Sequence, residues 1–299
     1  MSLTVAAAFA VVVWLAAGLA GGGLWVEFAL FAASAALVAE LSNRCALIRI
    51  YSAMVPCVFI ALMCSAPFLF ASLSVTGSQL CLVASVSVLL RCYQDRLSPG
   101  RTFYAFACLG LASLFYVRFL YFVPVYWLLM AFPLRSMSWR TAAASALGVC
   151  LPYWLCLPVA MATCGLPALS DHFRLLGVLW PPFDMGALTV NRVALLAFVV
   201  VLGVTGAVHF YRHRIDDKIR TRMFFNCFTV LAAASAALAV AQPQLYDMAM
   251  AMMIVCVSPL AGHFIALTRT RLTNIAFCLM AAAALLLTVF NLWMPSTRF

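Results

Sequence analysis

Few side chains in this sequence can take part in acid–base or ionic chemistry. From those that can donate or accept a proton, we take four as candidate catalytic residues: Glu27, Asp171, His172 and Asp247. We take four more as candidates to bind an anionic substrate: Arg118, Arg174, Arg192 and Tyr246. A guanidinium group holds a phosphate through paired hydrogen bonds, so the second set favours a phosphate-bearing ligand. Both sets are spread along the chain, so the fold has to bring their members together.

The rest of the chain is more apolar than a soluble protein. Hydrophobic residues make up 67% of its 299 residues, charged residues make up 9%, and the mean hydropathy is +1.10. Soluble domains have about 45–50% apolar and about 25% charged residues. We therefore expect an all-α protein, a polytopic transmembrane helical bundle that forms one integral membrane domain over residues 1–299 and contacts the lipid bilayer.

A helix that crosses a bilayer needs about 20 apolar residues. By this measure the sequence predicts about 11 spans, or 10 if two of the shorter stretches form a single span. The expected helices cover residues 3–21, 24–41, 50–70, 78–91, 103–117, 119–134, 141–163, 191–210, 223–241, 246–267 and 273–293.

The stretch 103–134 is too long for one ordinary span and short for two, and Arg118 is its one charged residue. If the chain turns back at Arg118, all but four of the 18 Lys and Arg residues lie in loops on one side. The four exceptions are Arg118, Arg174, Arg192 and Arg298. Because basic loops stay in the cytoplasm, we expect a hairpin or re-entrant pair with an external tip. The same rule predicts a cytoplasmic N-terminus and an external C-terminus, and we expect the membrane to be a bacterial inner membrane.

Two roles are open for Arg118. As an interfacial anchor, its guanidinium would extend to the outer lipid headgroups among neighbouring tyrosines. In a re-entrant segment, it would face a cavity and bind a phosphate, since a charge at membrane depth needs a partner.

The external loop 166–191 is the longest segment outside the predicted spans. Ser170 or Asp171 can cap a short helix that runs to about Val178 and lies in the membrane interface. This helix either covers a cavity in which Asp171 or His172 acts as an acid or base, or anchors the loop to the interface.

The cytoplasmic loop 211–222 is strongly basic. A basic cluster beside a membrane span is typical of contact with anionic lipids, so we do not expect a nucleic-acid partner. His209 and His213 are one helical turn apart, and His263 is near the same side of the membrane. No carboxylate is expected to join these three histidines, so we assign no metal, and the cofactor stays unknown.

The position of Glu27 resembles the layout of membrane glycosyltransferases that use polyprenyl-phosphate sugars. Glu27 is near the outer end of the second span, and further acidic residues are on later external loops. The resemblance implies that Glu27 is the base and that Arg118, Arg174 and Arg192 bind phosphate. This chain lacks a paired acidic motif in its first external loop and is shorter than those enzymes.

A second resemblance covers about half of the chain. The segments "GLASLFYVRFLYFVPVYWLLMAF" (110–132), "PLRSMSWR" (133–140), "LGVCLPYWL" (147–155) and "HFYRHRIDDKIRTR" (209–222) follow one another in a similar order in a group of bacterial inner-membrane proteins with no assigned activity. This resemblance is mainly one of hydropathy, and it implies only the membrane architecture.

We predict that the protein handles an amphipathic, phosphate-bearing or lipid-linked envelope precursor at its external face, as an enzyme or as a binding component. Two alternatives are a membrane transporter and a non-catalytic subunit with a membrane-protein partner. A transporter would need polar groups near the middle of the membrane, and the spans contain few.

Overall fold

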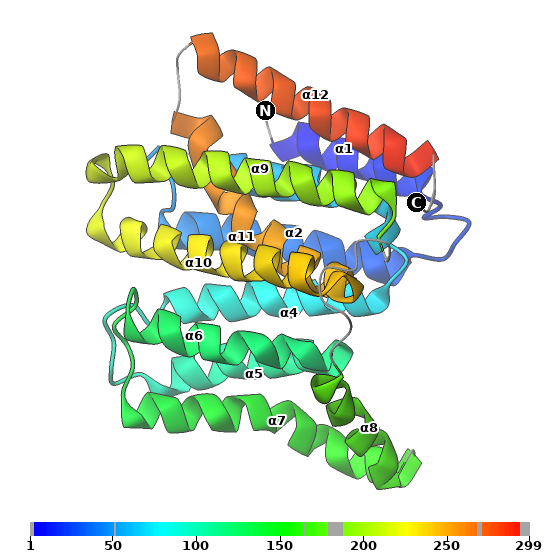
Figure 1. Ribbon diagram of the computed structural model, residues 1–299, viewed down its shortest axis with the longest axis vertical. Coiled ribbons are helices and arrows are strands. Elements are labelled where there is room, and N and C mark those ends of the chain that lie inside the picture. The colour runs from blue at the N-terminus through cyan, green and yellow to red at the C-terminus, as the bar shows by residue number, and fades with distance from the viewer. Residues whose placement is uncertain (1–2, 51, 164, 179–187, 268–270, 294–299) are drawn as a thin grey trace. The chain divides into compact units, whose positions relative to one another are not determined.

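The computed structural model describes residues 3–50, 52–163, 165–178, 188–267 and 271–293. Helices make up 84% of the structure, and no strand occurs in these ranges. The described residues form twelve α-helices, most of them labelled in Figure 1: α1 (Leu3–Ala16), α2 (Trp25–Cys45), α3 (Met54–Cys64), α4 (Leu73–Leu90), α5 (Pro99–Phe115), α6 (Phe122–Ala131), α7 (Trp139–Thr163), α8 (Gly165–Gly177), α9 (Val190–His213), α10 (Ile219–Ala241), α11 (Tyr246–Leu267) and α12 (Arg271–Trp293).

Seven of these helices are long and apolar enough to cross a membrane, which supports the prediction of a multi-pass membrane protein. They are α2, α4, α7, α9, α10, α11 and α12. The predicted number of about 11 spans is not confirmed, because α1, α3, α5 and α6 contain 14, 11, 17 and 10 residues. At 1.5 Å per residue, a helix of 11 residues reaches about 16 Å, roughly half of the hydrocarbon core.

The chain reverses direction between α5 and α6. A short 3₁₀ helix, η2 (Val117–Tyr121), makes the turn and contains Arg118. Beyond the far ends of the two helices, the Gln94 N–H donates to the Leu134 carbonyl at 2.8 Å. The residues that precede α5 therefore lie beside those that follow α6, as in a helical hairpin.

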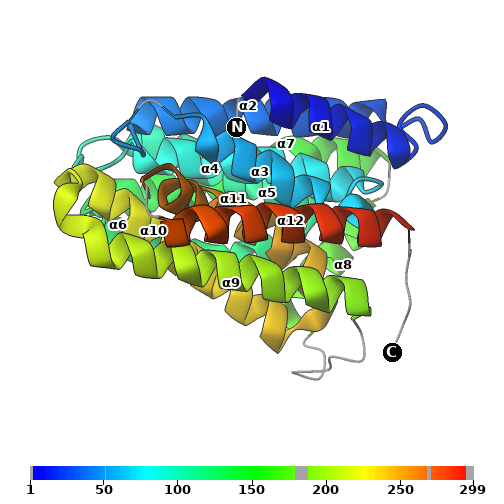
Figure 2. The same cartoon turned by 90° about the horizontal axis from the view of Figure 1, so that it is seen from above.

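Residues 1–76 and 183–299 form one compact unit, which we call unit 1, and residues 77–182 form a second, unit 2. In unit 1, α1 and α2 both pack against α3 (Figure 2). Trp14 of α1 is fully buried between them and stacks on Phe70 at 3.9 Å, with Phe28 and Phe31 of α2 at 5.4 and 5.5 Å. This aromatic cluster fixes the C-terminal end of α1 to the remainder of unit 1.

Helix α11 is the core of unit 1. It packs against α3, α9 and α10, and 78% of the residues in its most apolar stretch are buried. Gly206 of α9 allows a close approach, because a Cβ atom there would lie 2.7 Å from the Leu260 carbonyl group of α11. Small residues of this kind let helices pack closely in a membrane, where hydrophobic burial contributes little to association.

Helix α12 lies at the edge of unit 1. Only 11% of the residues in its most apolar stretch are buried. A polar contact holds its last turns, because the Asn291 side-chain amide donates to the Ser65 carbonyl at 2.7 Å. Most of α12 is therefore free to face lipid or another chain.

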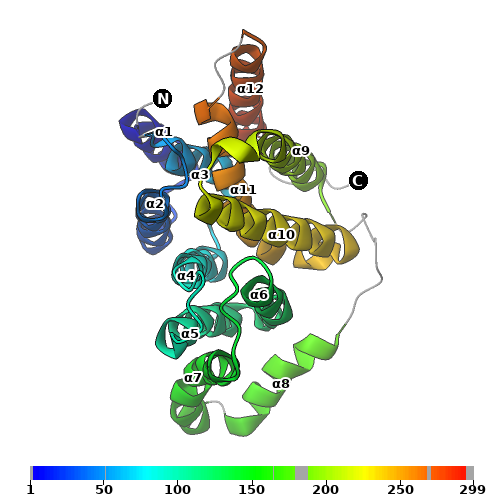
Figure 3. The ribbon, with the colours of Figure 1, turned by 90° about the vertical axis from the view of Figure 1, so that its left-hand side faces the viewer.

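Unit 2 contains most of α4 together with α5 to α8. Helices α4 to α7 are seen nearly end-on in Figure 3. The Ser85 hydroxyl of α4 donates to the Ala105 carbonyl of α5 at 2.7 Å and contacts the Tyr126 hydroxyl of α6 at 3.3 Å. Helices α5 and α7 approach closely at Gly148, where a Cβ atom would meet the Phe103 carbonyl oxygen.

Helix α8 occupies part of the 166–191 loop. It begins at Gly165, five residues before the expected cap at Ser170, whose hydroxyl instead donates to the Pro167 carbonyl inside the helix. Pro167 lies in its first turn, where a missing N–H is tolerated. Residues 179–187 of the loop lie outside the described residues.

Candidate functional site

Three of the predicted site residues meet at one end of unit 1. Arg192 is in the first turn of α9, and Tyr246 and Asp247 begin α11. Nη2 of Arg192 lies 3.2 Å from Oδ1 and 3.3 Å from Oδ2 of Asp247. The Tyr246 hydroxyl donates to the Arg192 carbonyl at 2.9 Å. Asp247 also lies where the positive end of the α11 dipole favours a carboxylate.

Two aromatic rings flank the Arg192 guanidinium. Its Cζ lies 5.4 Å from the ring centroids of Phe68 and Tyr246, within the range of a cation–π contact. The side chains of Arg192 and Asp247 are 31% and 33% exposed, so a ligand can reach the pair. This arrangement can bind an anion at Arg192 beside a carboxylate that can accept a proton.

Glu27 is not part of this group. It is half-buried in the first turn of α2, and the described contacts of Arg192, Tyr246 and Asp247 do not involve it. The structure therefore separates Glu27 from the other acidic candidate of unit 1.

In unit 2, Arg118 contacts the C-terminal end of α8. Its Nε donates to the Leu175 carbonyl at 3.1 Å and its Nη2 donates to the Val178 carbonyl at 3.2 Å. The Tyr121 hydroxyl donates to the Leu176 carbonyl at 2.6 Å. The last carbonyls of a helix have no partner within the helix, so Arg118 and Tyr121 cap α8. With 9% of its surface exposed, Arg118 is placed to hold α8 rather than to reach into solvent.

The other candidates of unit 2 are on α8 itself. Nε2 of His172 lies 3.1 Å from the Ser113 carbonyl oxygen, which can only accept, so this nitrogen carries the hydrogen. Asp171 and Arg174 are exposed. His172 thus has a structural contact to α5, and neither Asp171 nor Arg174 points to a described pocket.

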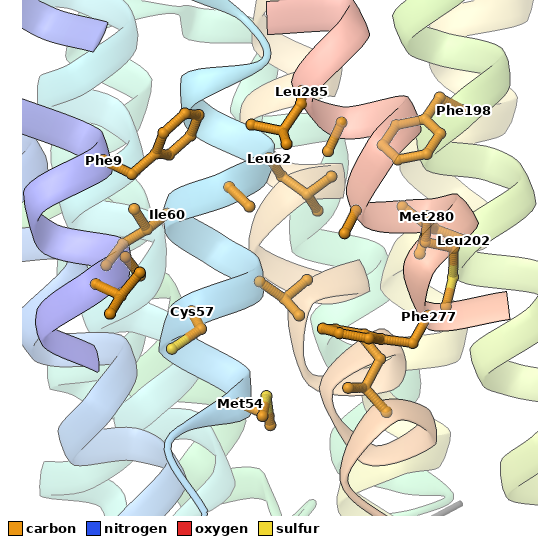
Figure 4. Close-up of a pocket in the computed structure, with 17 residues that line it drawn as sticks. Phe9, Met54, Cys57, Ile60, Leu62, Phe198, Leu202, Phe277, Met280 and Leu285 are labelled. Carbon is orange, nitrogen blue, oxygen red and sulfur yellow. The ribbon is translucent and has the colours of Figure 1, made fainter. Parts of the chain in front are cut away.

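A partly open cavity of about 220 Å³ lies in unit 1, between α1, α3, α9, α11 and α12. Its described lining is entirely apolar, and Figure 4 shows side chains such as Phe9, Leu62, Phe198 and Leu285 around it. The cavity could not be predicted from the sequence. Its lining residues belong to long apolar runs and are of the same types as the packed core residues.

The structure corrects the expectation that no carboxylate joins the cytoplasmic histidines. Nε2 of His263 lies 3.0 Å from Oδ2 of Asp217, and both side chains are buried. Arg222 holds the loop of Asp217 in place by donating to the Asp217 carbonyl at 2.8 Å. Within the described ranges, no group of three or more His, Cys, Asp or Glu residues is arranged to hold a metal ion.

We predict that Arg118→Ala loosens α8. Two carbonyls of its last turn lose their donors, at a cost of about 1–3 kcal/mol, so the α8 amides should exchange hydrogen roughly fivefold to a hundredfold faster. Hydrogen–deuterium exchange with mass spectrometry measures this change, and Arg174→Ala on the exposed face of α8 is the matched control. Unchanged exchange in Arg118→Ala would show that these hydrogen bonds do not hold the helix.

Comparisons of the chain with protein-family models, with curated proteins and with solved structures each found no match.

Proposed function

We propose that the protein binds an amphipathic, lipid-linked and phosphate-bearing molecule. Its hydrocarbon chain would occupy the cavity of unit 1, and its head group would lie at Arg192 and Asp247. The cavity is the main support, because apolar walls around about 220 Å³ of space suit an alkyl or isoprenoid chain and offer nothing to a polar solute.

The distance between the ion pair and the cavity suits such a molecule. Arg192 and Phe198 both belong to α9, and six residues of helix span about 9 Å. Phe68 contacts Arg192 and follows α3, whose residues Ala61 and Leu62 line the cavity. Both helices therefore lead from the charged end of unit 1 to its apolar cavity.

Arg192 has donors to spare for a phosphate. Within the described part of the chain, only its Nη2 contacts Asp247, and a guanidinium has five N–H donors. A phosphate can therefore bind beside Asp247 without displacing it, and Asp247 is then the candidate base if the protein is an enzyme.

Helix α12 suits entry of a chain from the bilayer. It forms one wall of the cavity, and only 11% of the residues in its most apolar stretch are buried. The cavity is already partly open, and a lipid that enters beside α12 would not have to cross water. A transporter and an assembly subunit remain the alternatives.

The location is proposed on the distribution of basic residues. All but four of the 18 Lys and Arg residues belong to loops on one predicted side, which supports an external face for Arg192 and Asp247. That the membrane is a bacterial inner membrane is proposed from the resemblance described above. A ligand bound there would be an envelope precursor. Anionic lipids would contact the loop 211–222 on the opposite side.

We predict that Ala281→Phe blocks chain binding. Ala281 lines the cavity, whereas the adjacent Ala282 is exposed and lies outside the lining, so Ala282→Phe is the matched control. Labelling by a prenyl phosphate with a diazirine at the chain end should fall at least tenfold in Ala281→Phe and stay unchanged in Ala282→Phe. Equal labelling of both variants would place the chain elsewhere.

Arg192→Gln should reduce binding of the prenyl phosphate while binding of the uncharged prenyl alcohol of the same length is kept. The loss of charged hydrogen bonds costs about 1.5–3 kcal/mol, which weakens affinity roughly tenfold to a hundredfold. Competition against the diazirine probe measures both affinities.

Arg192→Gln alone leaves the Asp247 carboxylate without its partner, so the double variant with Asp247→Asn is the control for that effect. Arg174→Gln removes the same charge elsewhere and is the control for the change in net charge. If the Arg192 variants lose phosphate and alcohol equally, the head group does not contact Arg192.

A further inference from the structure

Unit 1 buries an ionisable pair that the proposed function does not use. His263 is fully buried on α11, and the Asp217 side chain is 3% exposed in the connection between α9 and α10. A buried carboxylate is costly unless it is paired, and in a membrane protein such groups commonly have a function. The 3.0 Å contact between Nε2 and Oδ2 supplies that pairing.

The surroundings of His263 are aromatic on two sides. Phe225 of α10 and Phe210 of α9 have ring centroids 4.7 and 5.9 Å from the imidazole. These rings cover two sides of the imidazole, and the Asp217 carboxylate is the one negative group that contacts it among the described residues.

The other titratable and charged groups nearby come from three elements. Helix α9 contributes His209 and His213, the segment between α2 and α3 contributes Arg49, and α10 contributes Arg222. Arg49 forms its ion pair with Asp216, at 3.7 Å, and Arg222 contacts the main chain of Asp217. Neither arginine therefore neutralises the Asp217 carboxylate directly.

The three histidines form a row from the surface to the buried pair. His213 is exposed, and its ring stacks on that of His209 with centroids 4.5 Å apart. The rings of His209 and His263 are 5.8 Å apart. Nε2 of His209 and Nδ1 of His263 are both buried with no partner in the described residues. The two nitrogens do not bond to each other, so a proton would pass between these neighbouring rings through one bridging water.

We infer that His263 and Asp217 form a proton-binding site, which His209 and His213 connect to the aqueous surface. A proton from water enters at His213, passes to His209 and arrives at Nδ1 of His263. The product is an imidazolium beside the Asp217 carboxylate, and one positive charge is gained with no bond to carbon formed or broken. Asp217 stabilises the charged imidazole through its hydrogen bond to Nε2.

The site lies close to the cavity along α11. Gly262 packs against Val55 of α3, where a Cβ atom would meet the Val55 backbone at 3.0 Å, and Ile265 lines the cavity. His263 lies between these two residues in the sequence.

The test is a titration of the imidazole nitrogens by NMR, with ¹⁵N-histidine in the full-length protein in lipid nanodiscs. The sequence has four histidines, so single His variants assign the signals. In the wild type, His263 should change from one protonated nitrogen to two as the pH falls. Asp217→Asn should lower the midpoint of this titration by about one pH unit or more.

Asp216→Asn is the matched control, because Asp216 is the adjacent, exposed carboxylate and pairs with Arg49. In Asp216→Asn, the pH midpoint of the His263 titration should equal that of the wild type. His209→Phe should slow proton exchange at His263 at least tenfold, and His172→Phe in unit 2 should not.

Two results would overturn the inference: a wild-type His263 that stays neutral throughout, or equal midpoints in the wild type and Asp217→Asn. If Asp217→Asn does not fold, the wild-type titration and the exchange rate in His209→Phe still decide the question.

Discussion

A charged side chain that is buried among the apolar helices of this protein needs an ion pair or a hydrogen bond from another part of the chain. Asp217 receives a hydrogen bond from His263, Arg192 binds Asp247, and Arg118 binds the carbonyls of α8. The cost of an unpaired charge or polar group in a membrane is several kcal/mol, which exceeds most single packing contributions. These contacts therefore determine where helix ends and connections are held, and the apolar faces pack around them.

The helical membrane architecture could be predicted because it depends on local composition. Every predicted span corresponds to a helix, and Arg118 marks a reversal of the chain because a lone charge interrupts an apolar run. The number of spans could not be predicted, since four helices end after 10–17 residues at turns that hydropathy does not detect.

The partners of the charged groups could not be predicted either. Arg118 binds carbonyls 57 and 60 residues away, and Asp217 meets His263 across 46 residues. Sequence reasoning brought Arg192, Tyr246 and Asp247 to one predicted face, and the structure places them in contact. It missed the His263–Asp217 pair because a carboxylate in a basic loop is normally assigned to solvent. A cavity has no sequence signal, because it arises where side chains of helices that are distant in the sequence leave space between them.

The proposed ligand would have its head group at Arg192 and its chain among α1, α3, α9 and α12. The protonatable pair of His263 on α11 and Asp217 before α10 lies outside this binding site. The most direct measurement is electron cryomicroscopy of the protein in lipid nanodiscs, with a bound antibody fragment to aid alignment. We expect elongated density in the cavity that continues to a head group beside Arg192. A cavity closed by its own side chains, with no density at Arg192, would contradict the proposed function.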